Sequence, residues 1–292
     1  MENERYYGID IGGTTVKIGL VENGVVLDKW SVPTDTSDNG RNILPDIVRS
    51  LPGPAAGAAL AVPGAVLPDG TVNKCVNLGW GVCRPTEEFT TLTGIPCRVL
   101  NDANAAALAE QRLGGGKGFE SILFVALGTG VGAGVILDGA VRVGARGSAG
   151  EIGHMCIDPA DEAAACTCGH HGCLETYSSA TGISRLATLA GYPGLTCKQI
   201  VDAAAAGDGK LEAVVDRACD ILGRGIAGAC AIIDQEAVVL GGGVAQAGDY
   251  FRLKVEDAFE RYAFHACLGT EIRLATLGSD AGMLGTALYA MG

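Results

Sequence analysis

Two stretches of the chain repeat one pattern of glycine, threonine and apolar residues. The first runs from Gly8 to Gly24 and the second from Leu123 to Gly139, so that Gly13 matches Gly128 and each stretch ends on an Asx-Gly pair. Asn-Gly and Asp-Gly pairs join antiparallel strands because both turn positions need positive φ. The repeat therefore predicts a strand–loop–strand–turn–strand unit that occurs twice, and two similar domains facing each other across a cleft.

The rest of the chain alternates strand and helix patterns, which indicates an α/β protein. Strands are predicted at 58–62, 98–100 and 237–240, and helices at 42–50, 103–112, 181–189, 197–206, 211–233, 249–263 and 279–291. Residues 144–175 read as a loop-rich stretch, and the glycines at 114–116 mark a boundary. We expect a small N-terminal domain of residues 1–114, closed by the C-terminal helix at 280–292, and a large domain of residues 115–279.

Composition narrows the classes of function. The 292 residues carry a formal net charge of −12 and no basic block, which counts against nucleic acid or an anionic membrane as a partner. The polar N-terminus is unlike a signal peptide and no apolar run is long enough to span a bilayer, so a cytoplasmic protein is expected. Eleven cysteines, an odd number at scattered spacings, argue against a disulfide framework.

Three glycine-rich strings are candidate phosphate loops, because glycine lets backbone N–H groups approach phosphate oxygens closely. They are Gly12-Gly13-Thr14-Thr15, Gly128-Thr129-Gly130 and Gly241-Gly242-Gly243. The P-loop pattern is missing, and the first two strings lead into strands, which excludes a dinucleotide-binding fingerprint. A tight turn explains any one string alone, but the three together favour a nucleotide site.

Two charged residues accompany the first of these loops. Asp10 precedes it and could hold Mg²⁺ directly or through water, although a capping carboxylate is the alternative. Lys17 follows it and could neutralise phosphate charge, or it could simply face solvent.

Asp102 is the candidate catalytic base. It lies in the string Asn101-Asp102-Ala103-Asn104, where a buried strand meets a helix whose N-terminus favours a charged carboxylate. A kinase needs such a carboxylate beside the attacking hydroxyl. A plain N-cap is an equally good explanation from the spacing alone.

His154, Cys166, Cys168 and Cys173 have the residue types of a tetrahedral Cys₃His zinc site. Four protein ligands would close the site, so its zinc would be structural. His170, His171 and Cys156 are rival ligands, and reduced thiols in a flexible loop are the alternative. Glu151 and Glu175 flank the cluster, so a metal could hold both carboxylates in place.

Taken together, these strings resemble the ROK family (repressors, open reading frames and sugar kinases) of the actin/hexokinase-like superfamily. The resemblance covers essentially the whole chain. It rests on Asp10 to Thr14, Asn101 to Asn104, Leu127 to Gly132, Gly150 to His154, Cys166 to Glu175 and Gly241 to Gly243. It implies a duplicated ribonuclease H-like fold with a central nucleotide and sugar cleft.

The resemblance also implies roles for individual residues. It implies Asp102 as the base, and a sugar pocket of Gly64, Asn77, Asn101, Asp102, Glu151, His154 and Glu175. It implies zinc on His154 and the three clustered cysteines, phosphates at the first two loops, and adenosine near the third. The substrates would be ATP and a hexose, with Mg²⁺ and structural Zn²⁺, in a homodimer or homotetramer.

Within the family the sequence is most similar to bacterial ATP-dependent glucokinases, so glucose is the expected hexose. Kinases for N-acetylmannosamine, allose or fructose share the same core strings. Repressor members carry an added DNA-binding domain, for which the first loop, beginning at residue 12, leaves no room. A non-catalytic sugar sensor is a further alternative, but Asp10, Asp102 and all three loops are intact.

Overall fold

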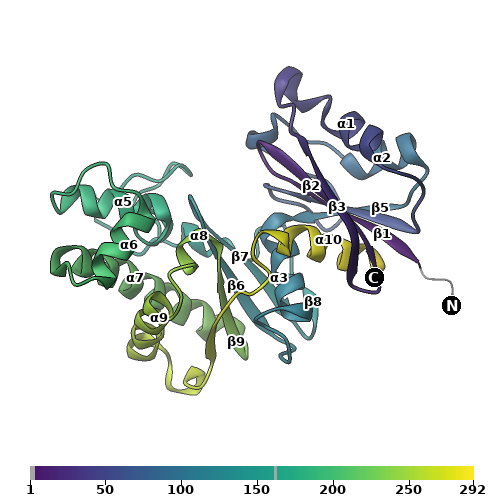
Figure 1. The fold of residues 1–292 in the computed structure, drawn as a ribbon. Coiled ribbons are helices and arrows are strands. Elements are labelled where there is room, and N and C mark those ends of the chain that lie inside the picture. The colour runs from purple at the N-terminus through teal and green to yellow at the C-terminus, as the bar shows by residue number, and fades with distance from the viewer. Residues whose placement is uncertain (1–3, 161–162) are drawn as a thin grey trace. The chain divides into compact units, whose positions relative to one another are not determined.

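The computed structural model describes residues 4–160 and 163–292 (Figure 1). The strands are β1 Arg5–Ile11, β2 Thr15–Glu22, β3 Val25–Pro33, β4 Gly57–Val62, β5 Cys97–Asn101, β6 Ile122–Leu127, β7 Val131–Leu137, β8 Ala140–Val141, β9 Ala237–Gly241 and β10 Glu271–Leu274. The α-helices are α1 Ile43–Ser50, α2 Pro85–Thr93, α3 Asp102–Leu113, α4 Glu175–Ser178, α5 Ala180–Leu189, α6 Cys197–Ala205, α7 Gly209–Ile233, α8 Gly242–Ala245, α9 Asp249–Tyr262 and α10 Ala281–Met291. Short 3₁₀ turns occur at η1 Ser37–Gly40, η2 Val76–Leu78, η3 Ile152–His154, η4 His265–Cys267 and η5 Gly278–Asp280.

Within the described ranges the strands form two five-stranded sheets of the same topology. Their orders are β3-β2-β1-β4-β5 and β8-β7-β6-β9-β10. Both predicted hairpin turns are present, with φ of 52° and 77° at Asn23 and Gly24, and of 55° and 70° at Asp138 and Gly139. The predicted duplication of an α/β unit is therefore confirmed.

The chain folds into two compact units. The first takes in Met1–Lys117, Gly134–Ala149 and Leu277–Gly292, and the second takes in Gly118–Ala133 and Gly150–Thr276. Strand β7 passes from the second unit into the first between Ala133 and Gly134. The domain division at residues 114 and 280 stays a prediction.

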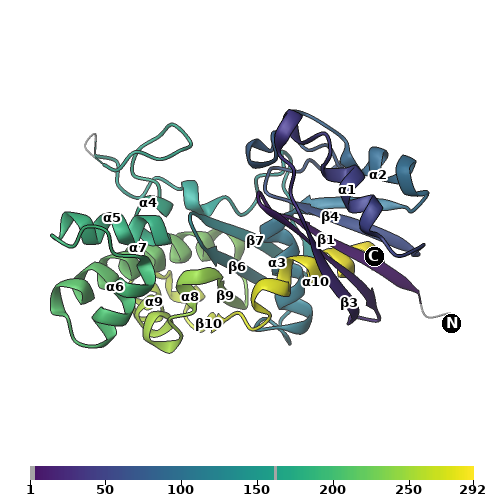
Figure 2. The same cartoon turned by 45° about the horizontal axis from the view of Figure 1, so that its top comes forward.

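Helices lie on both faces of the first unit's sheet (Figure 2). Helices α1 and α2 place Ile43, Leu44, Ile47 and Phe89 against one face. Helix α10 covers the other face, where Met283, Leu284 and Ala287 pack with Ala109 of α3. A Cβ at Gly8 of β1 would come within 2.9 Å of the Ala287 Cβ, so α10 lies directly on the sheet backbone.

The second unit is built around the parallel strands β6, β9 and β10. Strand β9 is buried at every residue, as expected for a strand covered on both faces. Helices α7 and α9 pack so closely that a Cβ at Gly223 would come within 2.7 Å of the Phe259 nitrogen. Among the described residues, no helix has both the length and the hydropathy to cross a bilayer.

Most predicted elements are present within a residue or two, but α2, α4, α8 and β10 were missed. Helix α2 buries only Pro85 and Phe89, so it carries little apolar periodicity. Strand β10 has four residues, and α8 begins within a run of glycines. These segments are shaped by their tertiary surroundings more than by local pattern.

Candidate functional site

Three neighbouring parallel strands of the first unit end side by side. The register places Asp10 of β1 beside Ala61 of β4, and Val62 of β4 beside Asn101 of β5. The chain beyond these ends contains the first Gly/Thr loop, Gly64 and Asp102. Ligands of open α/β sheets bind at the carboxyl ends of the strands. The fold thus collects these candidate residues at the edge where a ligand is expected.

The N-cap of helix α3 is Asn101. Its side-chain oxygen accepts hydrogen bonds from the backbone N–H groups of Ala103 and Asn104, at 2.9 and 3.2 Å. Its amide donates to the carbonyl of Gly64 at 3.3 Å, which ties the loop after β4 to the helix. The capping role is therefore filled by Asn101, and Asp102 is the first helical residue.

Asp102 is partly buried in the first turn of α3, where its carboxylate accepts a hydrogen bond from the Ala103 N–H at 2.8 Å. The N-terminal end of a helix stabilises the charged form of a carboxylate. The Cys75 thiol lies nearby: burial raises its pKa to about 11, and the Asp102 charge adds to that effect. The structure thus holds the Asp102 carboxyl group as a hydrogen-bond acceptor at the strand ends.

The loop around Gly64 is tightly packed. The Cys75 thiol donates to the Pro63 carbonyl at 3.3 Å, and a Cβ at Gly64 would come within 2.7 Å of the Lys74 carbonyl. Asn77 lies in η2, exposed, and its Cβ would be 3.8 Å from a side chain at Gly13. Gly64 and Asn77 therefore border the same strand ends as Asp102.

The first Gly/Thr loop is held by its own turn and by Thr34. Gly12 donates its N–H to the Thr15 carbonyl at 3.1 Å, and the Thr34 hydroxyl donates to the Gly12 carbonyl at 2.7 Å. Gly13, Thr14 and Thr15 are exposed. The loop therefore offers hydroxyls and backbone to solvent from a fixed frame.

Asp10 is partly buried beside the first turn of helix α10. A Cβ at Gly282 would come within 2.6 Å of the Asp10 carboxylate. Burial raises the pKa of Asp10, and the Lys17 charge partly opposes this rise. Lys17 faces Asp10 across the β1–β2 ladder, and its ammonium donates to the Ser279 carbonyl at 2.8 Å. In this structure Lys17 therefore binds the segment before α10.

The second and third loops lie together in the second unit. The register pairs Ala126 of β6 with Gly241 of β9, so both loops follow the ends of adjacent parallel strands. The Gly128 N–H donates a hydrogen bond across the loop to the Gly130 carbonyl at 3.0 Å. Gly242 has a φ of 85°, and a Cβ there would come within 2.7 Å of the Leu127 nitrogen. Only glycine fits so close to the second loop.

Glu175, at the start of α4, connects the second loop to the cysteine cluster. One carboxylate oxygen accepts from the Val131 N–H at 3.4 Å, and a Cβ at Gly130 would come within 2.6 Å of it. The other oxygen lies 3.0 Å from the Cys166 sulfur and 3.7 Å from His154 Nδ1. Glu151 lies on the opposite side of the ring, 3.9 Å from His154 Nε2.

His154, Cys166, Cys168 and Cys173 converge in the second unit. Their ligand atoms all lie within 4.8 Å of one another. The Cys168 and Cys173 sulfurs are 3.6 Å apart, and His154 Nδ1 is 3.6 Å from the Cys166 sulfur. Tetrahedral zinc, with Zn–S near ~2.3 Å and Zn–N near ~2.0 Å, sets these separations at about 3.8 and 3.5 Å. The cluster fits a bound metal, with Nδ1 as the histidine ligand.

The rival ligands lie differently. Cys156 pairs with Cys173 through a β-bridge, and its thiol is 3.7 Å from the Asp158 carbonyl. The His170 carbonyl accepts a hydrogen bond from the Cys166 N–H at 2.8 Å. His171 forms a β-bridge with Ala165. The four residues whose ligand atoms converge are the predicted ones, and their role as metal ligands stays a prediction.

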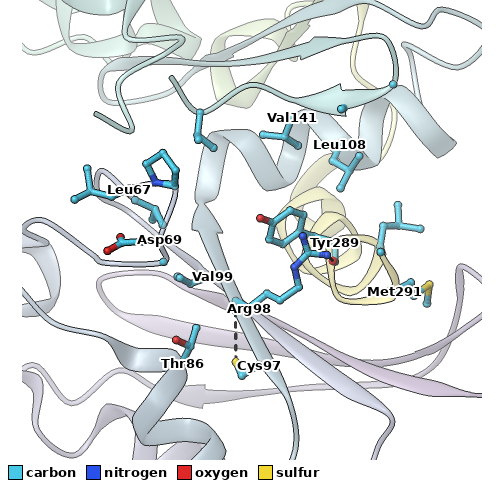
Figure 3. Close-up of a pocket in the computed structure, with 18 of the residues that line it drawn as sticks. Leu67, Asp69, Thr86, Cys97, Arg98, Val99, Leu108, Val141, Tyr289 and Met291 are labelled. Carbon is cyan, nitrogen blue, oxygen red and sulfur yellow. Dashed lines mark hydrogen bonds between the residues drawn. The ribbon is translucent and has the colours of Figure 1, made fainter. Parts of the chain in front are cut away.

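The first unit also contains a cavity of about 820 Å³ (Figure 3). Among the described residues that line it, none is a predicted site residue. The Arg98 guanidinium lies 3.9 Å over the Tyr289 ring and donates to the Tyr289 carbonyl at 2.6 Å. Asp69 forms an ion pair with Arg84 at 2.9 Å. The prominent charged groups of this cavity are engaged within the protein, so we assign it no reaction.

The sequence analysis singles out neither Glu110 nor Gly282 of the first unit. Glu110 is a buried acid inside the Ala-rich helix α3, and Gly282 packs against Asp10. A charged residue among the alanines of a buried helix is a signal that could have drawn attention to Glu110. The closeness of Gly282 to Asp10 depends on a contact between distant parts of the chain.

Comparison with known proteins places this geometry in a family. The family model described as "ROK family" matches residues 6–292. A glucokinase of Halalkalibacterium halodurans is 38% identical, over 98% of this chain and 94% of that protein. An N-acetylmannosamine kinase of Escherichia coli is 36% identical, over 97% of both chains.

Solved structures agree with the sequence relatives. A ROK family glucokinase from Streptomyces griseus, in complex with glucose and AMPPNP, superposes with a TM-score of 0.80 at 28% identity, over 98% of this chain and 99% of that one. The predicted actin/hexokinase-like fold is thereby confirmed. With the matched family model and full-length relatives above 30% identity, the chain belongs to the ROK family.

Proposed function

We propose that this protein transfers the γ-phosphate of ATP to a hydroxyl of a hexose, with glucose as the preferred sugar and glucose 6-phosphate as the product. The observation that carries the proposal is the 38% identity to a glucokinase over 98% of the chain. The local geometry supports it, because Asn101 caps helix α3 and Asp102 stands at the adjoining strand ends.

In this proposal Asp102 acts as the general base. The sugar hydroxyl oxygen attacks the γ-phosphorus, its proton passes to the Asp102 carboxylate, and the bond to the ADP oxygen breaks. The N-terminal end of helix α3 would favour the ionised carboxylate that a base requires. Gly64, Asn77 and Asn101 would orient the sugar in the first unit, and Glu151, His154 and Glu175 would contribute from the second.

The glycine loops would hold the nucleotide. The first two loops offer backbone N–H groups and threonine hydroxyls for phosphate oxygens, and the third would lie near the adenosine. Lys17 would supply positive charge if it exchanges the Ser279 carbonyl for a phosphate. Asp10 would hold Mg²⁺, directly or through water, and that ion would supply charge neutralisation at the phosphates.

The cysteine cluster would bind one structural zinc ion. Four protein ligands leave no open coordination position, so the metal would fix local structure and take no part in proton transfer. The 3.0–3.7 Å separations of Glu175 from Cys166 and His154 support a role in holding that carboxylate against the second loop.

The proposal is tested by an ATP-coupled activity panel over glucose, mannose, N-acetylmannosamine, allose and fructose. We expect turnover with ATP and the highest kcat/KM for glucose. A hydrogen-bonded pocket discriminates strongly, because a misplaced hydroxyl leaves buried groups unpaired. Absence of turnover with every sugar would reject the kinase proposal.

A kinase for N-acetylmannosamine is the second candidate. It is favoured by the 36% identity to the Escherichia coli enzyme over 97% of both chains. A kcat/KM for N-acetylmannosamine above that for glucose in the same panel would select this candidate.

Two further expectations stay predictions from the sequence: a cytoplasmic location, and assembly into a homodimer or homotetramer. Light scattering of the purified protein would test the assembly directly. A monomer at all concentrations would contradict it.

A further inference from the structure

Glu110 is a fully buried carboxylate that lies away from the sugar and phosphate residues. It belongs to helix α3, and its exposed fraction is 0%. One oxygen accepts the backbone N–H of Gly115 at 2.7 Å, and the other accepts the backbone N–H of Leu277 at 2.9 Å. A buried polar group is stable only where fixed partners satisfy it, so the two backbone donors give this side chain a defined place.

The turn after α3 wraps around the same residue. The Glu110 carbonyl accepts the N–H groups of Gly114 and Gly116 at 3.1 and 2.9 Å. A Cβ at Gly114 would come within 2.8 Å of the Glu110 carboxyl carbon and 3.0 Å of Leu277 Cγ. Gly114 therefore has to lack a side chain for the carboxylate to reach both amides.

Leu277 begins the segment 277–282, whose last two residues are the first two of helix α10. Besides the bond from Leu277 to Glu110, the segment accepts the Lys17 ammonium at the Ser279 carbonyl, 2.8 Å away. Lys29 forms an ion pair with Asp280 at 2.7 Å. The segment ends at Gly282, whose missing side chain leaves room for the Asp10 carboxylate.

Helices α3 and α10 pack with their backbones in direct contact at Gly285. A Cβ at Gly285 of α10 would come within 3.1 Å of the Ala105 Cα of α3. Helices in such contact have little freedom to slide, because interiors are close-packed. The position of the segment 277–282 against α3 therefore sets the position of the first turn of α10 against Asp10.

We propose that Glu110 is a positioning residue for phosphoryl transfer. Its carboxylate fixes the start of α10, and with it Asp10, relative to helix α3, whose first residue is Asp102. This inference rests on the proposed kinase function, in which Asp10 would hold the metal and Asp102 would take the proton. A small displacement of either carboxylate slows the reaction, since misplacement by about 1 Å can lower a rate by ~10²-fold.

Two variants disrupt the hydrogen bonds between the Glu110 side chain and the N–H groups of Gly115 and Leu277, each in a different way. In Glu110→Gln an amide NH₂ replaces one oxygen and faces a backbone N–H, so one of the two bonds becomes a donor–donor contact. In Gly114→Ala the added Cβ displaces the carboxylate by contact, and Glu110 itself stays intact. Gln111→Met is the matched control, because Gln111 is the next residue of α3 and is also buried.

The experiment measures kcat, the Mg²⁺ concentration for half-maximal rate, the Kd for glucose and the folded fraction by circular dichroism. For Glu110→Gln and Gly114→Ala we expect kcat to fall about tenfold or more and the half-saturating Mg²⁺ concentration to rise severalfold. The glucose Kd should stay within about twofold, because Gly64 and Asn101 lie at the other end of α3. Gln111→Met should keep the wild-type kcat and Mg²⁺ requirement.

The outcomes separate this inference from the proposed function. A wild type inactive with every sugar overturns the kinase function and this inference with it. An active wild type beside active Glu110→Gln and Gly114→Ala variants, with unchanged Mg²⁺ dependence, overturns the positioning role alone. Loss of folding in both variants, or equal losses of kcat and glucose affinity, would assign Glu110 a purely structural role and contradict the proposal.

Discussion

The two repeats share one scaffold but differ in chemistry. Both sheets have the same strand order, and both hairpins turn on an Asx-Gly pair with positive φ. At the position of Asp10 in the first repeat, the second repeat has Val125. At the position of Thr15, the second repeat has Gly130, against which the Glu175 carboxylate packs.

This difference shows how a duplicated fold divides its tasks. The first repeat carries its own buried acid, and its loop is held by Thr34. The second repeat has Val125 in place of the acid, and its loop is tied through Glu175 to the cysteine cluster. The same backbone thus presents a metal-binding carboxylate once and a metal-supported glycine loop once, in the function we propose.

The largest expected effect concerns the zinc ion that we propose for the cysteine cluster. This cluster is tied to the loop of the second repeat and, among the described residues, has no counterpart in the first. Cys173→Ser removes a buried ligand, and structural zinc contributes directly to folding free energy. We expect the variant to lose its zinc and roughly 3 kcal/mol or more of stability, about 5 °C or more in Tm for a chain of this size. Metal analysis and calorimetry measure both quantities.

Cys156→Ser is the control for this prediction. Cys156 pairs with Cys173 across a β-bridge but lies outside the four-residue cluster. It should retain about one zinc per chain. Full zinc content in Cys173→Ser, or its loss in Cys156→Ser, would show that the ligands are wrongly assigned.

The next effect concerns the acid that only the first repeat carries. Asp10→Asn should lower kcat by about 10²-fold, or ~2.7 kcal/mol, because the carboxylate that we propose to hold Mg²⁺ is lost. The same change should raise Tm at pH 7. Burial raises the pKa of Asp10 in the folded state, so ionisation costs stability as pH rises through that pKa.

The gain in Tm should therefore disappear at low pH. Below the ordinary carboxyl pKa of 3.8, Asp10 is protonated in both the folded and unfolded chains. Melting curves of wild type and Asp10→Asn between pH 3 and 8 provide the comparison. A Tm advantage that grows toward low pH would mean that burial does not dominate at this carboxylate.

The smallest effect tests what the repeats share. Gly24→Ala and Gly139→Ala each place a Cβ in the left-handed region, at φ of 77° and 70°. Each should lose about 1–2 kcal/mol of unfolding free energy, and the two losses should be similar. Gly53→Ala, where a Cβ meets open space, should lose much less. Unequal losses at the two turns would mean that the hairpins are not equivalent in stability.

Much of the fold could be predicted because short local sequence patterns determine it. The Asx-Gly turns, the apolar strands and the Ala-rich helix α3 all have short-range signatures, and the structure contains them. Helix α2 and strand β10 were missed because one buries two residues and the other has four residues in all. Their conformation depends on the sheet and helices around them.

The candidate site divides in the same way. The sequence predicts four zinc ligands, and the structure brings their ligand atoms within 4.8 Å of one another. Spacing could not decide between a cap and a base for Asp102, whereas the structure gives the cap to Asn101. The bonds of Glu110 and Lys17 to the segment 277–282 join residues more than 160 positions apart, which no local pattern encodes.

Asp102→Asn tests the central claim most directly. Glucose phosphorylation with ATP and glucose binding by calorimetry should be measured on wild type and variant together. The account predicts that kcat falls by roughly 10²–10⁴-fold while glucose Kd stays near its wild-type value, since the amide keeps the shape but cannot take the proton. A variant that phosphorylates glucose at the wild-type rate would contradict it.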